Sequence, residues 1–156
     1  MQILNTPNLN ELRKQIQKLQ KADKSEKIAI LSQDDDFNRK ALEIKGPSLF
    51  IINESLQIKD YMKQRASGLN EVLAKLAKSR NIQIAIEIDK IIAKDSKEKA
   101  RALARLIQNI MLCKKAGTKL SFISENKELD KKDLQALFLS LGATTKQAQE
   151  ALKEGF

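Results

Sequence analysis

A stretch near the middle of the chain, residues 67–88, changes from a helical to a strand pattern within a few positions. Ser67 is expected to cap the helix, because a serine hydroxyl can accept a hydrogen bond from a free amide of the first turn. The second half has isoleucine at every other position from 82 to 88, which is the period of a strand. So short a turn between helix and strand predicts half of a βαβ unit, and therefore a parallel sheet. The helical half places apolar residues at spacings of three and four, which predicts one buried face: Leu69, Val72, Leu73, Leu76 and Ala77.

Short apolar runs alternate with amphipathic segments along the rest of the chain. Further strands are expected near residues 1–4, 28–31, 49–52 and 120–123, and further helices near residues 8–20, 34–44, 96–116, 130–141 and 145–153. This order predicts an α/β fold with a parallel sheet, in a single domain that covers residues 1–156. A regular barrel of eight βα units needs roughly 200–250 residues. We therefore expect a TIM-barrel-like parallel βα repeat that forms a compact or incomplete barrel.

The structural role of two segments is not decided by the sequence pattern. The carboxylates Asp34, Asp35 and Asp36 follow an expected strand, so they could cap the next helix or bind a metal ion. Capping is the preferred interpretation, because a carboxylate at a helix N-terminus is stabilised by about 0.3–1 kcal/mol. Residues 55–66 show no clear period, and we expect an irregular loop with one helical turn around Tyr61.

The chain carries a large excess of positive charge. Its 29 lysine and arginine residues outnumber its 20 aspartate and glutamate residues, which gives a formal net charge of +9. Such an excess suits either a polyanionic partner or simply a well-solvated surface. Aromatic residues make up only 4% of the chain, so base stacking has few side chains to use. Any RNA contact would then depend on phosphates and shape.

The single cysteine, Cys113, excludes an internal disulfide and fits a reducing cytoplasm. It lies on the apolar face of the longest expected helix, so we expect a buried structural thiol. No apolar run approaches the ~20 residues of a membrane span, and residues 1–10 lack a signal-peptide core, so no membrane partner is expected. The apolar face of that helix is expected to include Ala100, Leu103, Leu106, Ile107, Ile110 and Cys113.

An α/β protein places its site at the carboxyl ends of its parallel strands. The chain has no histidine, which removes a common metal ligand and the commonest general base. It also has no glycine-rich phosphate loop. We therefore expect no catalytic residue, and no metal or cofactor bound by this chain. The strand-end residues are Ser32, Gln33, Asn53, Glu54, Glu87, Asp89, Ser124 and Glu125.

An alternative is a small metal-dependent phosphoesterase, because carboxylate oxygens alone can hold magnesium. Its candidate ligands are Asp34, Glu54, Glu87 and Glu125. The absence of histidine favours a non-catalytic RNA-binding protein over this alternative.

Basic side chains provide the candidate RNA contacts, because arginine in particular suits bidentate phosphate binding. For each of them, a solvated side chain on a helix surface is the simple alternative. Arg65 is the strongest candidate, because it precedes a helix N-terminus whose free amides favour an anion. Its alternative role is an ion pair with Glu87 or Asp89. The candidate RNA-binding residues are Arg39, Arg65, Arg80, Arg101, Arg105, Lys131 and Lys132.

Four blocks of the sequence resemble the archaeal ribonuclease P protein component 3 family, the thirty-kilodalton subunit type. The block RASGLNEVLAKLAKSRNIQIAIEI at residues 65–88 looks like that family's SGL-x-x-VLAKLA segment and the strand that follows it. DDDFNRKALE at residues 34–43 is similar to its acidic motif. ARALARLIQNIMLCKKAGTKLSFISE at residues 100–125 and LDKKDLQALFLSLG at residues 129–142 resemble its later helices. The resemblance spans about residues 28–155.

The resemblance implies a barrel-like, non-catalytic protein subunit of the archaeal ribonucleoprotein that removes the 5′ leader from precursor tRNA. In that endonuclease the RNA carries out the hydrolysis and uses magnesium. The implied partners are the ribonuclease P RNA, a companion subunit called component 2, and the other ribonuclease P proteins, in the cytoplasm. The fold is also similar to phosphoesterases of the polymerase-and-histidinol-phosphatase type, with the metal site lost.

The chain departs from the family's pattern at several places. Asn53 and Glu71 stand where family members often have histidine. Residues 55–64 have no close counterpart, and the N-terminal region looks shortened by about one βα unit. Arg39, Arg65 and Arg101 are retained, which keeps the implied RNA-binding role.

Overall fold

The computed structural model describes residues 1–55, 59–126 and 129–153. Within them, five strands form one parallel sheet, and helices lie between the strands. The strands lie in chain order, so each pairs with its neighbours in sequence. All five expected strands are confirmed. They are β1 (Gln2–Leu4), β2 (Ile28–Leu31), β3 (Leu49–Ile52), β4 (Gln83–Glu87) and β5 (Leu120–Ile123).

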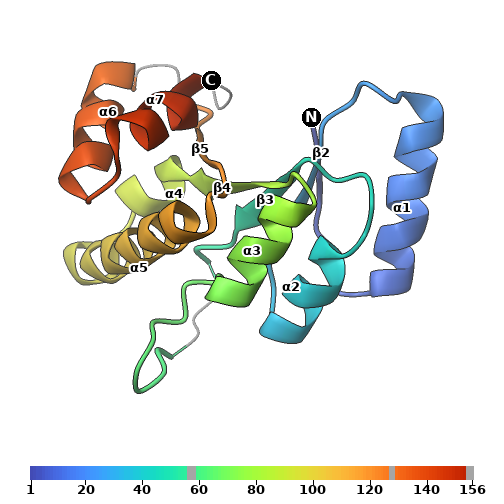
Figure 1. Cartoon of the computed structure of the whole chain (residues 1–156), viewed down its shortest axis with the longest axis horizontal. Helices are drawn as coiled ribbons and strands as arrows, with labels where there is room; N and C mark the ends of the chain where they lie inside the picture. Colours follow the sequence, from blue (N-terminus) through green and yellow to red (C-terminus); the bar gives the residue numbers. More distant parts are fainter. Residues whose placement is uncertain (56–58, 127–128, 154–156) are drawn as a thin grey trace.

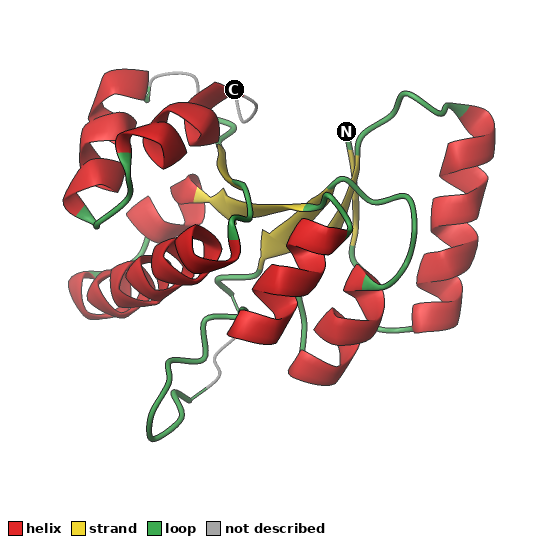
Figure 2. Cartoon of the chain, viewed as in Figure 1, coloured by secondary structure: helices red, strands yellow, loops and turns green. Residues whose placement is uncertain are grey.

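Helices connect the strands and cover one side of the sheet (Figures 1 and 2). α1 packs beside α2, α2 beside α3, and α3 beside α5, while α7 packs against β5. Parallel strands in sequence order with helices outside them are the arrangement of an incomplete TIM-like barrel, and the expected fold class is confirmed. The helices are α1 (Leu9–Ala22), α2 (Asp35–Leu42), α3 (Glu71–Ser79), α4 (Ile88–Ile92), α5 (Ser96–Ala116), α6 (Lys131–Ser140) and α7 (Thr145–Lys153).

The two faces of the sheet bury separate apolar clusters, because alternate strand residues point to opposite sides. On the side of the helices, Ile30, Phe50 and Ile84 belong to the main core and are at most 1% exposed. The other face carries a smaller cluster around Ile51 and Ala85. Burial on both faces explains why β2 and β3 read as continuous apolar runs.

The central helix, α3, begins later than expected. The cap expected at Ser67 is wrong: the side chain of Asn70 accepts from the amide of Leu73 at 2.9 Å, and Ser67 donates to the carbonyl of Leu69. Gly68 lies between them with a φ of +71°, in the left-handed region, which prevents a right-handed helix from starting at Ser67. Leu73 and Ala77 lie on the buried face as expected, but Val72 is 61% exposed, so its expected burial is wrong.

Other local expectations are partly corrected. The side chain of Asp34 caps α2 by accepting from the amide of Phe37 at 2.8 Å, as expected, but α2 ends at Leu42 rather than at 44. The short helix α4 was not expected, since residue 88 continues the isoleucine alternation of β4. Residues 59–66 form no helical turn, and residues 56–58 of the expected loop lie outside the described residues.

The longest helix, α5, has the expected bounds but not the whole expected buried face. Ile107 is 38% exposed, while Arg105 is only 8% exposed. Gly117 ends the helix in the left-handed conformation, with φ of +70°. No helix in the described part of the chain is long and apolar enough to cross a membrane.

Candidate nucleic-acid interface

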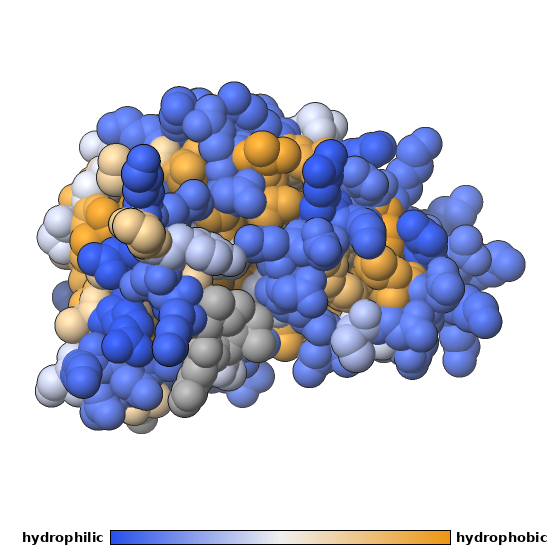
Figure 3. Space-filling view, turned by 90° about the horizontal axis from the view of Figure 1, so that it is seen from below, coloured by the Kyte–Doolittle hydropathy of each residue, from blue (hydrophilic) through white to orange (hydrophobic). Residues whose placement is uncertain are grey.

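Residues 59–70, which precede α3, project from the carboxyl-end edge of the sheet and are seen below the body of the molecule in Figure 1. This segment is bound to α5 through residues 60 and 65–67. Seen from that side, hydrophilic residues cover much of the surface and apolar residues form separate patches (Figure 3). This edge is where the strand ends meet, so it is the first place to look for a site.

Asp60 fixes this segment to α5. Its carboxylate accepts from the amide of Ala66 at 2.9 Å, from Nη1 of Arg65 at 3.2 Å, and from Nε and Nη2 of Arg105 at 3.2 and 3.1 Å. Burial alone would raise the pKa of Asp60, but the Ala66 amide and the two guanidinium groups hold it below its usual value. Asp60 is therefore an ionised anchor for both arginines.

Two consecutive polar residues of α5 bind the backbone of the same segment. Gln108 accepts from the Arg65 amide at 3.0 Å and donates to the Arg65 carbonyl at 2.9 Å and the Ser67 hydroxyl at 2.8 Å. Asn109 is fully buried and donates to the Ser67 carbonyl at 3.1 Å. These contacts set the position of the backbone immediately before α3.

A buried carboxylate lies next to this anchor. Glu54, two residues after β3, is 7% exposed, and its burial raises the pKa of its carboxyl group, while Arg105 and Lys94 act in the opposite direction. Lys94 also donates to the Glu54 carbonyl at 3.1 Å. Arg105 thus balances the charges of two acids and has a structural position inside the molecule.

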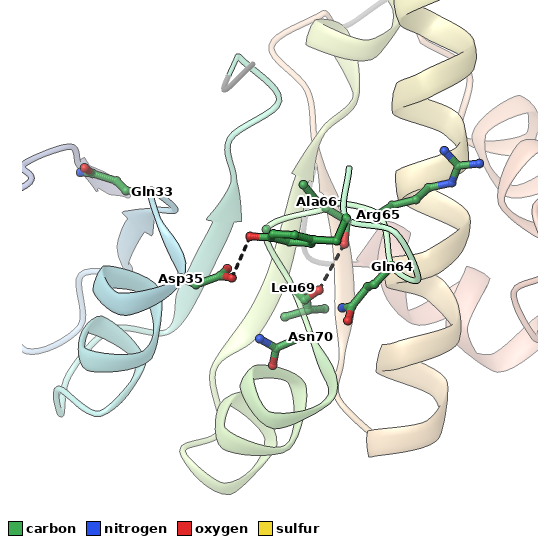
Figure 4. Close-up of a pocket in the computed structure, with 10 residues that line it drawn as sticks. Gln33, Asp35, Gln64, Arg65, Ala66, Leu69 and Asn70 are labelled. Carbon is green, nitrogen blue, oxygen red and sulfur yellow. Dashed lines mark hydrogen bonds between the residues drawn. The ribbon is translucent and has the colours of Figure 1, made fainter. Parts of the chain in front are cut away.

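A small pocket of about 60 Å³ lies between the start of α2 and the start of α3 (Figure 4). Asp35 points toward it and accepts from the hydroxyl of Tyr61 at 3.3 Å. Arg65 extends away from the pocket toward α5, where it pairs with Asp60. The ion-pair partners expected for Arg65 are wrong, because Glu87 pairs with Lys90 and Asp89 accepts from Ser124 and Glu125.

The structure does not bring the candidate RNA-binding residues together into one cluster. Arg65 and Arg105 share Asp60, but Arg105 is buried, which argues against a direct contact between it and RNA. Arg39 lies on α2 with a side chain that is 67% exposed, 4.0 Å from Glu43. The other candidates are exposed on separate elements: Arg80 at the end of α3, Arg101 on α5, and Lys131 and Lys132 in the first turn of α6.

Three of the four carboxylates of the phosphoesterase alternative have other structural roles. Asp34 caps α2, Glu87 pairs with Lys90 at 2.6 Å, and Glu54 is buried beside Arg105. Across residues 1–55, 59–126 and 129–153, no three histidine, cysteine, aspartate or glutamate side chains are placed to hold a metal ion. No arrangement in these residues favours the phosphoesterase alternative.

Sequence reasoning missed three residues that organise this edge: Asp60, Gln108 and Asn109. Asp60 falls in a segment without any period, and its main partner, Arg105, is 45 residues away. Asn109 did give a signal, because an asparagine next to the apolar residue Ile110 within a buried helical face needs a hydrogen-bond partner. The identity of that partner depends on the fold.

Comparison with solved structures found a chain of similar fold in a cryo-EM structure described as archaeal ribonuclease P with mature tRNA. The TM-score is 0.77 and the sequence identity is 27%, over 96% of this chain and 62% of that chain. This chain therefore spans somewhat less than two thirds of the length of that structural neighbour. No protein-family model and no curated protein matches this chain.

Proposed function

We propose that this chain is a protein subunit of ribonuclease P, which binds the catalytic RNA and supports removal of the 5′ leader from precursor tRNA. The observation that carries the proposal is the likeness, over 96% of the chain, to a chain in the structure of archaeal ribonuclease P with mature tRNA. The four sequence blocks that resemble the component 3 family support the finer proposal that this is a component 3 type subunit.

In this proposal the chain itself carries out no chemistry. The RNA partner uses magnesium and cleaves the phosphodiester, while the chain, together with a component 2 companion and the other ribonuclease P proteins, supports the active RNA fold. For this role we propose a location in the cytoplasm. Exposed cations and a net charge of +9 supply the attraction to phosphates that this role needs.

Reconstitution tests the proposal directly. Cleavage of precursor tRNA is measured with the ribonuclease P RNA alone, with this chain added, and with this chain and a component 2 subunit added. We expect the complete set to cleave at magnesium concentrations at which the RNA alone is inactive. An unrelated basic protein of similar net charge is the control for charge neutralisation, and equal stimulation by that protein would contradict the proposal.

The chain alone provides the test of its non-catalytic role. Without the RNA, it should leave precursor tRNA intact at every magnesium concentration. Cleavage that survives controls for contaminating nuclease, and that disappears in Asp34→Ala, would show that the chain is an enzyme in its own right.

A further inference from the structure

A second charged surface lies away from the strand ends, in a groove between α1 and the ends of α2 and α3. These helices stand side by side in Figure 1, and α1 contacts α2 as α2 contacts α3. The groove has a volume of about 630 Å³. Its polar lining includes the four cations Arg13, Lys40, Lys45 and Arg80, with Glu43 as the single carboxylate.

The four cations have no ion-pair or side-chain hydrogen-bond partner among residues 1–55, 59–126 and 129–153. A minority of the other cations do: for example, Arg65 and Arg105 pair with Asp60, and Lys75 and Lys115 pair with Glu71. By contrast, Arg13, Lys40, Lys45 and Arg80 are exposed and make no ion pair or side-chain hydrogen bond within the part of the chain that the structure describes. The one carboxylate of the groove, Glu43, lies 4.0 Å from Arg39 instead.

Helix electrostatics explain only half of this charge. Lys40 lies in the last turn of α2 and Arg80 follows the end of α3, where a cation is favoured by the helix dipole. Arg13 lies in the first half of α1, and Lys45 lies beyond the end of α2, so the dipole does not favour either of them. Four like charges around a concave surface instead raise the local concentration of an anionic ligand.

The turn after α2 packs against α1 beside the groove. Gly46 has a φ of +119°, and a Cβ atom there would lie 2.3 Å from the Gln20 side chain on α1. The turn after α2 therefore packs against the Gln20 and Ile16 side chains of α1, and its positive φ favours glycine at position 46. Lys45, which precedes Gly46, lines the groove together with the α1 residues Arg13, Gln17 and Gln20.

We infer that this groove binds the phosphate backbone of RNA, at a surface separate from the segment 59–70. The inference rests on the proposed function and identifies a binding surface for it. The groove lining contains no aromatic side chain, so the recognition is of phosphate and shape and not of bases. Glutamine amides at 17 and 20 add neutral donors between the cations.

The test measures binding of the ribonuclease P RNA against salt. The first variant, Arg13→Gln with Lys45→Gln, changes two cations that do not support a helix end. Each lost phosphate contact should reduce the slope of log K against log salt by ~0.7–0.9, so the double variant should lose ~1.4–1.8. The control, Lys146→Gln with Lys153→Gln on α7, removes the same charge from a distant helix and should keep the wild-type slope.

Chemical protection gives a readout that does not depend on a variant folding. On the wild-type chain, bound RNA should protect Lys40 and Lys45 from acetylation, while Lys146 and Lys153 stay reactive. The outcomes separate the two proposals. Absence of RNA binding by the wild-type chain would overturn both. Normal RNA binding, with an unchanged slope in the first variant and no protection of Lys40 and Lys45, would overturn the groove alone.

Discussion

Replacement of Arg105 by alanine should destabilise the protein much more than any replacement of an exposed arginine. Arg105 is 8% exposed, and its guanidinium donates twice to the same oxygen of Asp60, at 3.2 and 3.1 Å. It also lies near the buried carboxyl group of Glu54. The variant would leave two acids without the cation that they share.

The size of the effect follows from how buried the pair is. Loss of one partner from a fully buried ion pair costs about 3–5 kcal/mol, whereas exposed pairs contribute about 0.2–1 kcal/mol. The Arg105 side chain is 10% exposed but that of Asp60 is 27% exposed, which places this pair between the two cases. We expect a loss of about 2–3 kcal/mol in the free energy of unfolding, or a Tm lower by ~4–12 °C for a domain of this size.

The loss should depend on pH in a defined direction. The lowered pKa of Asp60 means that its stabilising contribution is present above its unfolded pKa and is lost as the pH falls. The raised pKa of Glu54 means that its carboxyl group favours folding below its unfolded pKa, and this contribution is lost as the pH rises. Removal of Arg105 weakens the first contribution at neutral pH and raises the pKa of Glu54 further. Both effects make the loss larger near pH 7 than near pH 4.

Thermal unfolding followed by circular dichroism at both pH values measures this loss. Arg101→Ala is the matched control, because it removes an exposed arginine one turn earlier on the same helix and should stay within about 0.5 kcal/mol of wild type. Faster hydrogen exchange at the amides of Arg65 and Ala66, which bind Gln108 and Asp60, should accompany the loss. If Arg105→Ala melts together with Arg101→Ala, or if its deficit is the same at both pH values, the buried-anchor argument is wrong.

Four further predictions can each be tested separately. Lys75 and Lys115 lower the pKa of Glu71 to about 2, so the wild-type protein gains stability from this carboxylate above pH 4.5 and loses it as the pH falls toward 2. Urea unfolding across that range should show that Glu71→Gln lacks this contribution. Burial raises the pKa of the Cys113 thiol to about 12, so a thiol reagent at pH 8 should label it only after unfolding, and rapid labelling of the native chain would contradict its buried position. If about four phosphates are neutralised, log K for RNA binding in a filter-binding assay should fall against log salt with a slope near −3. A slope near zero would mean that the net charge serves solubility alone. Arg65→Ala should lower the Tm by no more than ~2 °C, because the Arg65 side chain is 49% exposed and Arg105 still pairs with Asp60. If Arg65 contacts RNA, the variant should also reduce the slope of log K against log salt by ~0.7–0.9.

The sequence by itself determined the order and type of the strands and of most helices. Runs such as Ile28–Leu31 and Leu49–Ile52 predict buried strands in an α/β chain, because four large or β-branched apolar residues in a row are typical of a strand that is covered on both faces. The cap at Asp34 and the end of α5 at Gly117 were also predictable, because both depend on hydrogen bonds and backbone angles within a few residues. These features are local, so the periods and caps of the chain are sufficient to find them.

The tertiary structure alone decided which charged residues have partners. Arg101 and Arg105 are one turn apart and cannot be distinguished by composition, yet Arg101 is exposed and Arg105 is buried beside an acid from a segment without any period. In the same way, Arg13 on the first helix and Arg80 after the third meet at one groove although 67 positions separate them. The free energy of a charge depends on its distance from other charges and on its exposure to water. Both quantities are set by packing between distant elements, so a sequence pattern cannot provide them.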